Sequence, residues 1–389
     1  MKALQICNKS PYPAREGGPI AMNAITQLLQ NQGYEVKILA INTPKYFVST
    51  EEVDAEYQQK TAIEWIWVDN RVNMRSALKS LLKNASYHVD RFRSKQFEAK
   101  ISEILSEETF DLVVLETVYL SVYVDVIRKQ FSGRLVLRAH NVEHLIWERI
   151  AKNTFFGLKK LYLSLLAKQL KSFEKSVVSR YDEIWCISGQ DVQWFENQNR
   201  NKCVRLVPFG IKQQNISDKN IDYQCNNLFF LGSMDWYPNK EGVVWFLDNV
   251  WQAIHQKYPH LTFRIAGRNI PPHWKQLNYK GVEIVGEVEN AVDFLEENGV
   301  LVVPLRSGSG VRIKIIEAMA VGKVIITTTI GLEGINAVHK KHVLLADTVS
   351  EFADAVTFCL QQPKQCQAIG ENARQFIREN HNLDKWREQ

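Results

Sequence analysis

Short apolar runs rich in β-branched residues alternate along the whole chain with segments whose apolar positions recur every three or four residues. The first pattern predicts strands buried on both faces, the second predicts amphipathic helices, and their alternation predicts βαβ units with parallel sheets. Helices are expected at residues 20–32, 97–107, 240–257, 311–321 and 352–360. Strands are expected at residues 3–7, 36–41, 63–68, 112–115, 135–138, 183–187, 204–207, 228–231, 262–266, 282–285, 300–303, 324–327 and 343–345.

The alternation is interrupted at residues 212–227, which are polar, rich in Asn and Gln and without either periodicity. This composition is typical of a linker, and a chain of 389 residues exceeds what one hydrophobic core usually supports. We therefore predict an α/β protein with a doubly wound N-terminal domain (1–211), a linker (212–227) and a second doubly wound domain (228–375). Residues 376–389 form a C-terminal tail, and one option is that this tail crosses back to the first domain. Ligands of such sheets bind outside the carboxyl ends of the strands.

One strand end carries an unusual cluster of charges, in the sequence VVPLRSGSGVRIKIIEAMA. The expected strand ends at Pro304, a glycine-containing loop follows, and a helix is expected from Val311. Arg312 and Lys314 then fall in the first helical turn, where a cation opposes the helix dipole unless an anion such as a diphosphate lies beside it. Glu317 follows in the same helix with a carboxylate suited to two ribose hydroxyls. Taken singly, each of these charges is also what the solvated face of an ordinary helix carries.

The stretch 304–334 resembles the donor-binding motif of retaining glycosyltransferases of GT-B fold, the family 4 type (glycosyl transferases group 1). It is similar to the branch that reads G-S-G-x-R-x-K-x-x-E-A-M-A, and the order of landmarks agrees along the whole chain. The resemblance implies two Rossmann-like domains that face a central cleft. One departure stands out: the first Glu of the family's E-x7-E pair falls at Ser309, which leaves the identity of the donor sugar open.

The resemblance also assigns roles to individual residues. Catalysis is expected of His140, Arg312 and Lys240. Ser233 stands where the family often has an arginine, so we expect Arg312 to supply that charge. The residues expected to bind the nucleotide-sugar donor are Gly17, Gly18, Gly232, Ser233, Ser309, Gly310, Val311, Lys314, Glu317 and Glu333.

The acceptor is expected to meet the first domain at the end of the strand 135–138. His140 follows this strand, and Arg138 and Asn141 are candidates on the acceptor side. A histidine at a strand end is often structural, and a Gly-Gly pair such as Gly17-Gly18 is often only a turn; here the match to the family's positions favours the functional interpretation.

Charge is distributed unevenly between the halves. Residues 1–212 hold 30 Lys and Arg against 23 Asp and Glu, whereas the remainder holds 18 against 20. A basic first half suggests an anionic partner: a membrane surface, a phosphorylated acceptor or nucleic acid. The basic segment 71–100 and the amphipathic segment 155–180 fit core-packed helices with a solvated face, and the alternative is attachment to an anionic membrane surface. The six cysteines show no metal-binding or disulfide spacing, which favours the cytoplasm.

The expected activity is therefore transfer of a sugar from a UDP-, GDP- or dTDP-linked donor to a hydroxyl of a saccharide or lipid-linked acceptor. Retention and a place in cell-surface polysaccharide or glycoconjugate synthesis are implied by the resemblance alone. No D-x-D triplet is present, so neither a metal nor a cofactor is expected. Nucleic acid is not an expected partner. The enzyme is expected in the cytoplasm, with peripheral attachment to the inner face of the membrane as one option. The alternatives are a nucleotide-sugar epimerase of the same fold and a non-catalytic nucleotide-sugar-binding protein, which the serine at position 309 keeps open.

Overall fold

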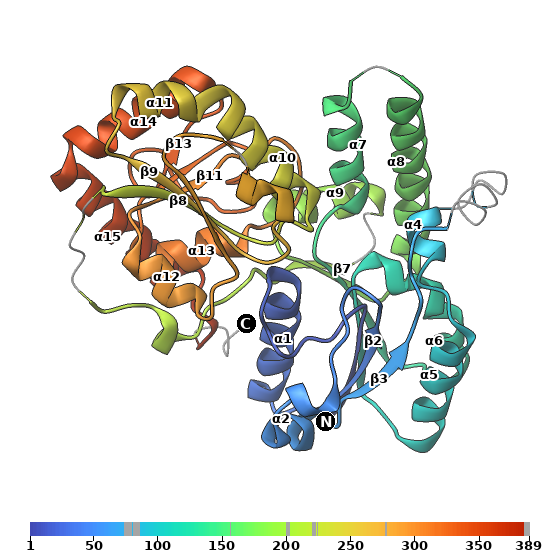
Figure 1. Cartoon of the computed structure of the whole chain (residues 1–389). Coiled ribbons are helices and arrows are strands. Elements are labelled where there is room, and N and C mark those ends of the chain that lie inside the picture. The colour runs from blue at the N-terminus through green and yellow to red at the C-terminus, as the bar shows by residue number, and fades with distance from the viewer. Residues whose placement is uncertain are drawn as a thin grey trace. The chain divides into compact units, whose positions relative to one another are not determined.

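The computed structural model describes residues 1–384 apart from 74–79, 81–85, 156, 200–202, 220–222, 224 and 277. The chain divides into two compact units, one of Met1–Pro208 and one that begins at Phe209 (Figure 1). We call them unit 1 and unit 2. No helix in the described ranges is both long enough and apolar enough to cross a membrane.

Unit 1 is built on a sheet whose described strands are all parallel and follow the order β3-β2-β1-β4-β5-β6-β7. The chain leaves β1 toward one edge and returns from β3 to pair β4 against β1, so the winding direction reverses between β1 and β4. The strands are β1 (Lys2–Cys7), β2 (Glu35–Asn42), β3 (Glu64–Trp67), β4 (Leu112–Glu116), β5 (Arg134–Ala139), β6 (Glu183–Cys186) and β7 (Cys203–Leu206).

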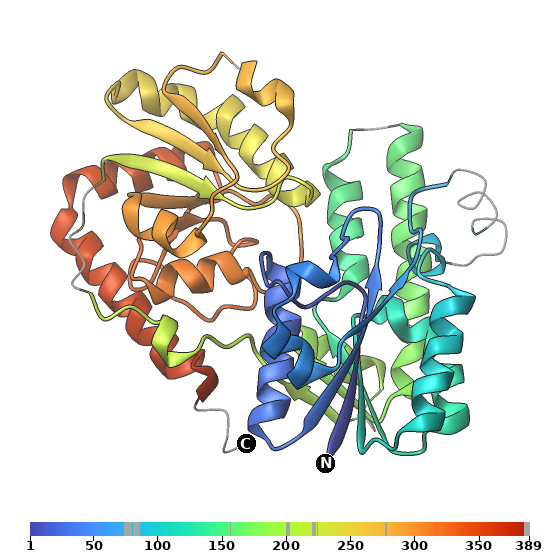
Figure 2. The same cartoon turned by 60° about the horizontal axis from the view of Figure 1, so that its bottom comes forward.

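Helices cover both faces of this sheet (Figure 2). Leu4 and Ile6 of β1 pack with Phe97 on one face, whereas Ala3 and Cys7 pack on the other. Alternate residues of one strand thus reach two cores, which explains why β1 is mostly apolar, with Gln5 as its one buried polar residue. The helices are α1 (Gly17–Asn31), η1 (Thr50–Glu52), α2 (Ala55–Thr61), α4 (Tyr87–Asp90), α5 (Lys95–Glu107), η2 (Val118–Tyr123), α6 (Val124–Gln130), α7 (Glu143–Asn153), α8 (Leu158–Val177), η3 (Val178–Arg180) and α9 (Gly189–Gln198).

Unit 2 repeats the same winding in a second parallel sheet, with the strand order β10-β9-β8-β11-β12-β13. Its strands are β8 (Asn227–Leu231), β9 (Thr262–Ala266), β10 (Val282–Gly286), β11 (Val300–Val303), β12 (Ile325–Thr327) and β13 (Leu344–Leu345). Its helices are η4 (Gln213–Asn215), α10 (Tyr237–Phe246), the π-helical turn η5 (Leu247–Trp251), α11 (Gln252–Lys257), η6 (Pro272–Gln276), α12 (Ala291–Glu297), α13 (Ile313–Ala320), α14 (Val349–Gln361) and α15 (Pro363–Asn380).

The thirteen strands expected from the sequence are confirmed, as are two doubly wound α/β units. Helix boundaries were less accurate. The helix expected at 20–32 begins at Gly17, so the Gly17-Gly18 pair lies inside its first turn, and the helix expected at 240–257 begins at Tyr237 and contains η5. The helix expected from Val311 begins at Ile313 with Arg312 as its N-cap. A helix begins where the backbone first takes up helical dihedral angles, and the spacing of apolar residues does not specify that residue.

The segment expected to be a linker packs on unit 2. Nδ2 of Asn382 donates to Oε1 of Gln213, and the amide of Ser217 donates to the carbonyl of Ala320. Ile211, just before the segment, forms a backbone bridge with Asn382. The division between the units falls before Phe209, and the described part of the expected tail, 376–384, belongs to unit 2. Residues 385–389, and with them any return to unit 1, lie outside the described residues.

Candidate functional site

The loop between β11 and α13 is shaped by two glycines. Gly308 and Gly310 have φ angles of 118° and 78°, which favour glycine because a Cβ is strained there. A Cβ on Gly308 would lie 2.8 Å from Nη2 of Arg312 and 3.1 Å from the ring of Trp236. The loop therefore passes between these two side chains with no room for a larger residue.

Arg312 closes this loop from the helix side. Its side chain is buried, at 4% exposed, and Nη1 donates to the carbonyls of Ser309 and Gly310. Its guanidinium also lies 5.1 Å from the ring centroid of Trp236, at cation–π distance. The structure thus gives Arg312 a role that the sequence did not suggest: it holds the loop, from a position just before the helix. Ser309 is buried in the same loop, and Val311 between them is half-buried.

Lys314 lies in the first turn of α13 and reaches the end of β8. Its Nζ donates to Oδ1 of Asn239 at 2.9 Å and lies 4.1 Å from the ring centroid of Phe230. A Cβ on Gly232 would lie 2.4 Å from this Nζ, so only glycine leaves space for the ammonium group. Burial, assisted by the nearby positive charge of Arg312, lowers the pKa of Lys314 to about 7.

Asn239 was not identified from the sequence, although it connects the parts of this site. It is buried at the start of α10, where Nδ2 donates to the carbonyl of Ser233 at 2.7 Å while Oδ1 accepts from Lys314. One amide thus fixes both the loop after β8 and the lysine from α13. A polar residue beside Lys240 in the sequence YPNKEG was the available signal.

Glu317 lies one turn after Lys314 on the same helix. Burial raises the pKa of its carboxyl to about 7, against the opposing effect of Lys314. Among the described residues, no hydrogen bond engages this carboxylate. An acidic group that is partly desolvated and not hydrogen-bonded is suited to accept hydrogen bonds from ligand hydroxyls.

The remaining predicted residues of unit 2 lie on the same edge of the sheet. Ser233 follows Gly232 directly after β8, and Lys240 is half-buried in the first turns of α10. Glu333 lies in the turn after β12; Oγ1 of Thr328 ties this turn to the end of β11 by donating to the carbonyl of Leu305 at 2.7 Å. The ends of β8, β11 and β12 thus bring the expected donor residues of unit 2 to the place where the winding reverses, which is where doubly wound sheets bind ligands.

In unit 1, the corresponding edge carries a buried Glu–His pair. Nε2 of His140 lies 2.6 Å from Oε2 of Glu116, whose side chain is fully buried, while that of His140 is 11% exposed. Oε1 of Glu116 accepts from Nε2 of Gln5 at 2.7 Å, and Oε1 of Gln5 accepts from Oγ1 of Thr26. Both carboxylate oxygens are therefore committed, and the imidazole is held in one orientation. Glu116 was missed although it directly follows the expected strand 112–115.

The two other predicted residues around His140 differ in burial: Arg138 is buried and Asn141 is half-buried. Arg138 is 1% exposed, donates to the carbonyl of Trp185 and faces Glu116, so the structure gives it an interior role rather than an acceptor-facing one. Asn141 donates to Oε1 of Glu143 at 3.2 Å. Burial raises the pKa of Glu143 to about 7, although its hydrogen bond from Tyr119 opposes the shift.

The glycine pair of unit 1 lies beside a lysine. Gly17 and Gly18 form the start of α1, and a Cβ on Gly18 would lie 2.7 Å from Cε and 2.9 Å from Nζ of Lys9. Lys9 follows β1, pairs with Glu16 at 3.0 Å and lies 4.2 Å from the ring centroid of Tyr46. The pair therefore makes room for the ammonium group of Lys9 at the amino end of a helix.

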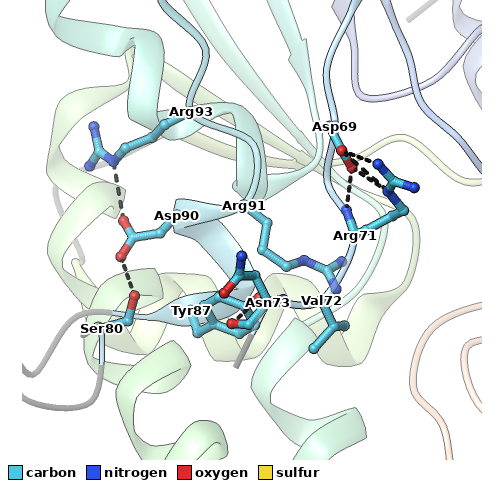
Figure 3. A pocket seen from close by; sticks show the side chains of 9 residues that line it. All are labelled: Asp69, Arg71, Val72, Asn73, Ser80, Tyr87, Asp90, Arg91 and Arg93. Carbon is cyan, nitrogen blue, oxygen red and sulfur yellow. Dashed lines mark hydrogen bonds and ion pairs between the residues drawn. The ribbon is translucent and has the colours of Figure 1, made fainter. Parts of the chain in front are cut away.

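A separate hollow of about 540 Å³ in unit 1 is lined by charged side chains that already pair with one another (Figure 3). Arg71 pairs with Asp69 at 2.6 Å, and Asp90 accepts from Arg93 and from Ser80. Residues 74–79 and 81–85 adjoin this lining and lie outside the described residues, so we assign the hollow no role. In the described ranges, no three His, Cys, Asp or Glu side chains gather as they do around a metal ion.

Comparison with known proteins shows what unit 2 and the whole chain are similar to. Residues 225–362 match the family model described as Glycosyl transferases group 1. An uncharacterized 44.6 kDa protein in the cps region of Klebsiella pneumoniae is 22% identical over 396 residues, which cover 99% of this chain and 97% of that protein.

Solved structures match over nearly the full length at low sequence identity. Sucrose-phosphate synthase from Thermosynechococcus elongatus superposes with a TM-score of 0.71 and 16% identity, covering 99% of this chain and 96% of that one. HepE of Anabaena, in complex with UDP and glucose, gives 0.64 and 14%, with 99% and 96% covered. TarM gives 0.70 and 10%, with 99% and 97% covered.

The fold is therefore GT-B: two Rossmann-like α/β units of parallel sheet, as the resemblance implied. The matched family model covers most of unit 2, which contains the cluster of Gly232, Asn239, Lys314 and Glu317. Together these findings support a glycosyltransferase.

Proposed function

We propose that the protein transfers a sugar from a nucleotide-sugar donor to a hydroxyl of a saccharide or lipid-linked acceptor, with retention and without a metal ion. The observation that carries the proposal is the partly buried contact of Lys314 with Asn239 beside Gly232, one helical turn from Glu317. A desolvated lysine and carboxylate on one helix suit a diphosphate and a ribose, and they lie in the segment that matches the group 1 model.

The chemistry demands charge stabilisation at the leaving group. The bond from the anomeric carbon to the β-phosphate oxygen breaks, and its electron pair stays on the nucleoside diphosphate. The acceptor oxygen forms the new bond on the same face, and its proton passes to the leaving phosphate. Lys314, Lys240, Arg312 and the amino end of α13 supply positive potential for that charge. The absence of a D-x-D triplet from the sequence supports a metal-free reaction.

In this proposal His140 orients the reacting hydroxyl and sugar rather than attacking. A carboxylate only accepts hydrogen bonds, so Glu116 fixes the proton on Nε2 and leaves Nδ1 as an acceptor. Gly17 and Gly18 admit the donor phosphates or sugar beside Lys9.

The cellular role is proposed from the relatives. The K. pneumoniae relative is described as a protein in the cps region. Structures similar to this chain were solved in complex with UDP, with glucose or with alpha-GlcNAc-glycerol. We propose a role in polysaccharide or glycoconjugate synthesis, with the enzyme in the cytoplasm at the inner face of the membrane. Ser309 leaves UDP-, GDP- and dTDP-linked sugars all as candidate donors.

The test is a donor panel. The purified full chain is incubated with UDP-, GDP- and dTDP-sugars, with and without EDTA, and nucleotide release is measured together with the anomeric configuration of the product by NMR. We expect the enzyme to turn over one donor class and EDTA to have no effect. Lys314→Met and Glu317→Gln should each lower kcat/KM by roughly a hundredfold.

Three outcomes would contradict the proposal in different ways. A donor that binds without any turnover, over a range of acceptors, indicates a binding protein. Conversion of the donor to its epimer without a new glycosidic bond indicates an epimerase. Turnover that survives Lys314→Met unchanged shows that the phosphate site lies elsewhere.

A further inference from the structure

The exposed side of α8 carries an apolar stripe near its beginning. Leu158, Leu161 and Leu165 repeat at i, i+3 and i+7 and are 88%, 68% and 38% exposed, and Tyr162 lies on the same face at 37%. Phe155, just before the helix, is 91% exposed. Single apolar side chains on a surface are ordinary, whereas a contiguous group of large ones marks an interaction site.

This stripe does not hold the helix in place. The opposite face of α8 is buried through Leu163, Leu166 and Leu170, and α7 packs beside it (Figure 1). α7 and α8 form a helical hairpin, and the stripe lies at the start of α8, near the connection between the two helices. Both views show this end of the hairpin extending beyond the sheet of unit 1 (Figures 1 and 2). We call the group Phe155, Leu158, Leu161, Tyr162 and Leu165 the hairpin tip.

The charge around the hairpin tip identifies its partner. Residues 149–171 contain six Lys and Arg and no Asp or Glu, and the side chains of Lys152, Lys159 and Lys168 are exposed. A second copy of the same surface would bring like charges together, which opposes self-association. An apolar stripe flanked by lysines is instead the composition of helices that lie in the headgroup region of anionic bilayers.

We propose that the hairpin tip inserts shallowly into the surface of an anionic bilayer. Phe155, Leu158 and Leu161 enter the boundary between headgroups and acyl chains, and the lysines contact the lipid phosphates. The inference rests on the membrane location proposed above and assigns it a surface; it is carried by α8 and its surroundings and does not depend on sugar transfer.

The experiment is flotation of the full chain with vesicles of phosphatidylcholine, with or without about one-third phosphatidylglycerol. We expect binding to the anionic vesicles that weakens as salt rises. The double variant Leu158→Gln/Leu161→Gln should bind roughly tenfold or more weakly because two apolar side chains lose their insertion. Lys159→Gln/Lys168→Gln should lose about tenfold at low salt and less at high salt.

Matched controls replace exposed apolar residues and exposed lysines of unit 2 instead. Val292→Gln/Val338→Gln removes exposed apolar groups, and Lys275→Gln/Lys364→Gln removes two exposed charges; both should bind like the unchanged protein. A melting temperature within about 2 °C of the parent shows that each variant folds.

Insertion itself is measured with a polarity-sensitive dye on Leu158→Cys. Cys203, which is exposed, is first replaced by Ser. The emission should shift to the blue on adding anionic vesicles. Three results would overturn the proposal: no binding at low salt, binding that the tip variants leave unchanged, or a tip-dependent dimer that does not bind vesicles. Donor turnover of the tip variants in solution separates this failure from failure of the proposed activity.

Discussion

His140 donates from Nε2 to a carboxylate oxygen of Glu116, 2.6 Å away, and that carboxylate is buried at the end of β4. Thr117, the next residue, has a φ of 83°, a conformation that non-glycine residues rarely adopt and that concentrates at functional sites. The pair lies at the ends of β4 and β5, and β4 borders β1 where the sheet of unit 1 reverses its winding.

Replacing Glu116 with Gln should lower kcat by roughly ten- to a hundredfold with little change in donor KM. The amide donates to His140, so the imidazole proton moves to Nδ1 and the ring presents the wrong tautomer. Gln5 still finds an acceptor, so stability should change little. Steady-state kinetics and thermal unfolding check both expectations.

A double-mutant cycle decides whether Glu116 acts through His140. If it does, Glu116→Gln should have almost no further effect in a His140→Ala background, because coupled groups are not additive. Additive losses would show that Glu116 serves the fold or another group instead.

Nucleotide-sugar affinity should be greatest near pH 7 and fall on both sides. The pKa of Lys314 is lowered to about 7, and a bound diphosphate raises it by stabilising the ammonium; affinity therefore falls as pH rises above 7. The pKa of Glu317 is raised to about 7, and ribose hydroxyls lower it by stabilising the carboxylate; affinity therefore falls as pH drops below 7. Each limb approaches tenfold per pH unit at most.

Calorimetry with a phosphonate analogue of the donor measures these limbs, because that analogue has no phosphate monoester that titrates near pH 6. Lys314→Met should remove the alkaline limb and Glu317→Gln the acid limb. Because the two groups interact, the apparent pKa values belong to the pair. A wild-type profile that is flat from about pH 6 to 9 would exclude both assignments.

Gly232→Ala should weaken donor binding by about tenfold or more, since its Cβ would lie 2.4 Å from Nζ of Lys314 and 3.1 Å from Nδ2 of Asn239. The lysine must then leave its position beside the ligand. Gly189→Ala is the matched control, because a Cβ there meets nothing within 4 Å. Equal donor affinities for the two variants, measured by calorimetry, would show that the space at Gly232 is unimportant for binding.

Apolar periodicity was sufficient to predict two doubly wound units, because the central strands of both sheets are buried on two faces and are mostly apolar. It also placed Gly232, Lys314 and Glu317 at strand and helix ends that the structure brings to one edge. What it could not predict are contacts set by tertiary structure. Lys314 meets Asn239 across 75 residues, and Arg312 turns back on its own loop because the helix begins at Ile313, two residues later than expected. Glu116 meets His140 because β4 and β5 are neighbours in the sheet.

Glu174 should be the most stabilising of the buried carboxylates near this edge. It is fully buried and accepts from the backbone amides of Glu143 and His144 and from Nδ1 of His144, so it caps α7 from α8. Glu174→Ala leaves these donors unpaired in the interior and should cost about 3–5 kcal/mol, lowering the melting temperature of unit 1 by several degrees or more.

Glu148→Ala is the control: its pair with Lys171 at 3.1 Å is well exposed on both sides and should contribute less than about 1 kcal/mol. Differential scanning calorimetry resolves the two transitions if the units unfold separately, and similar small shifts for both variants would show that Glu174 does not cap α7 in solution.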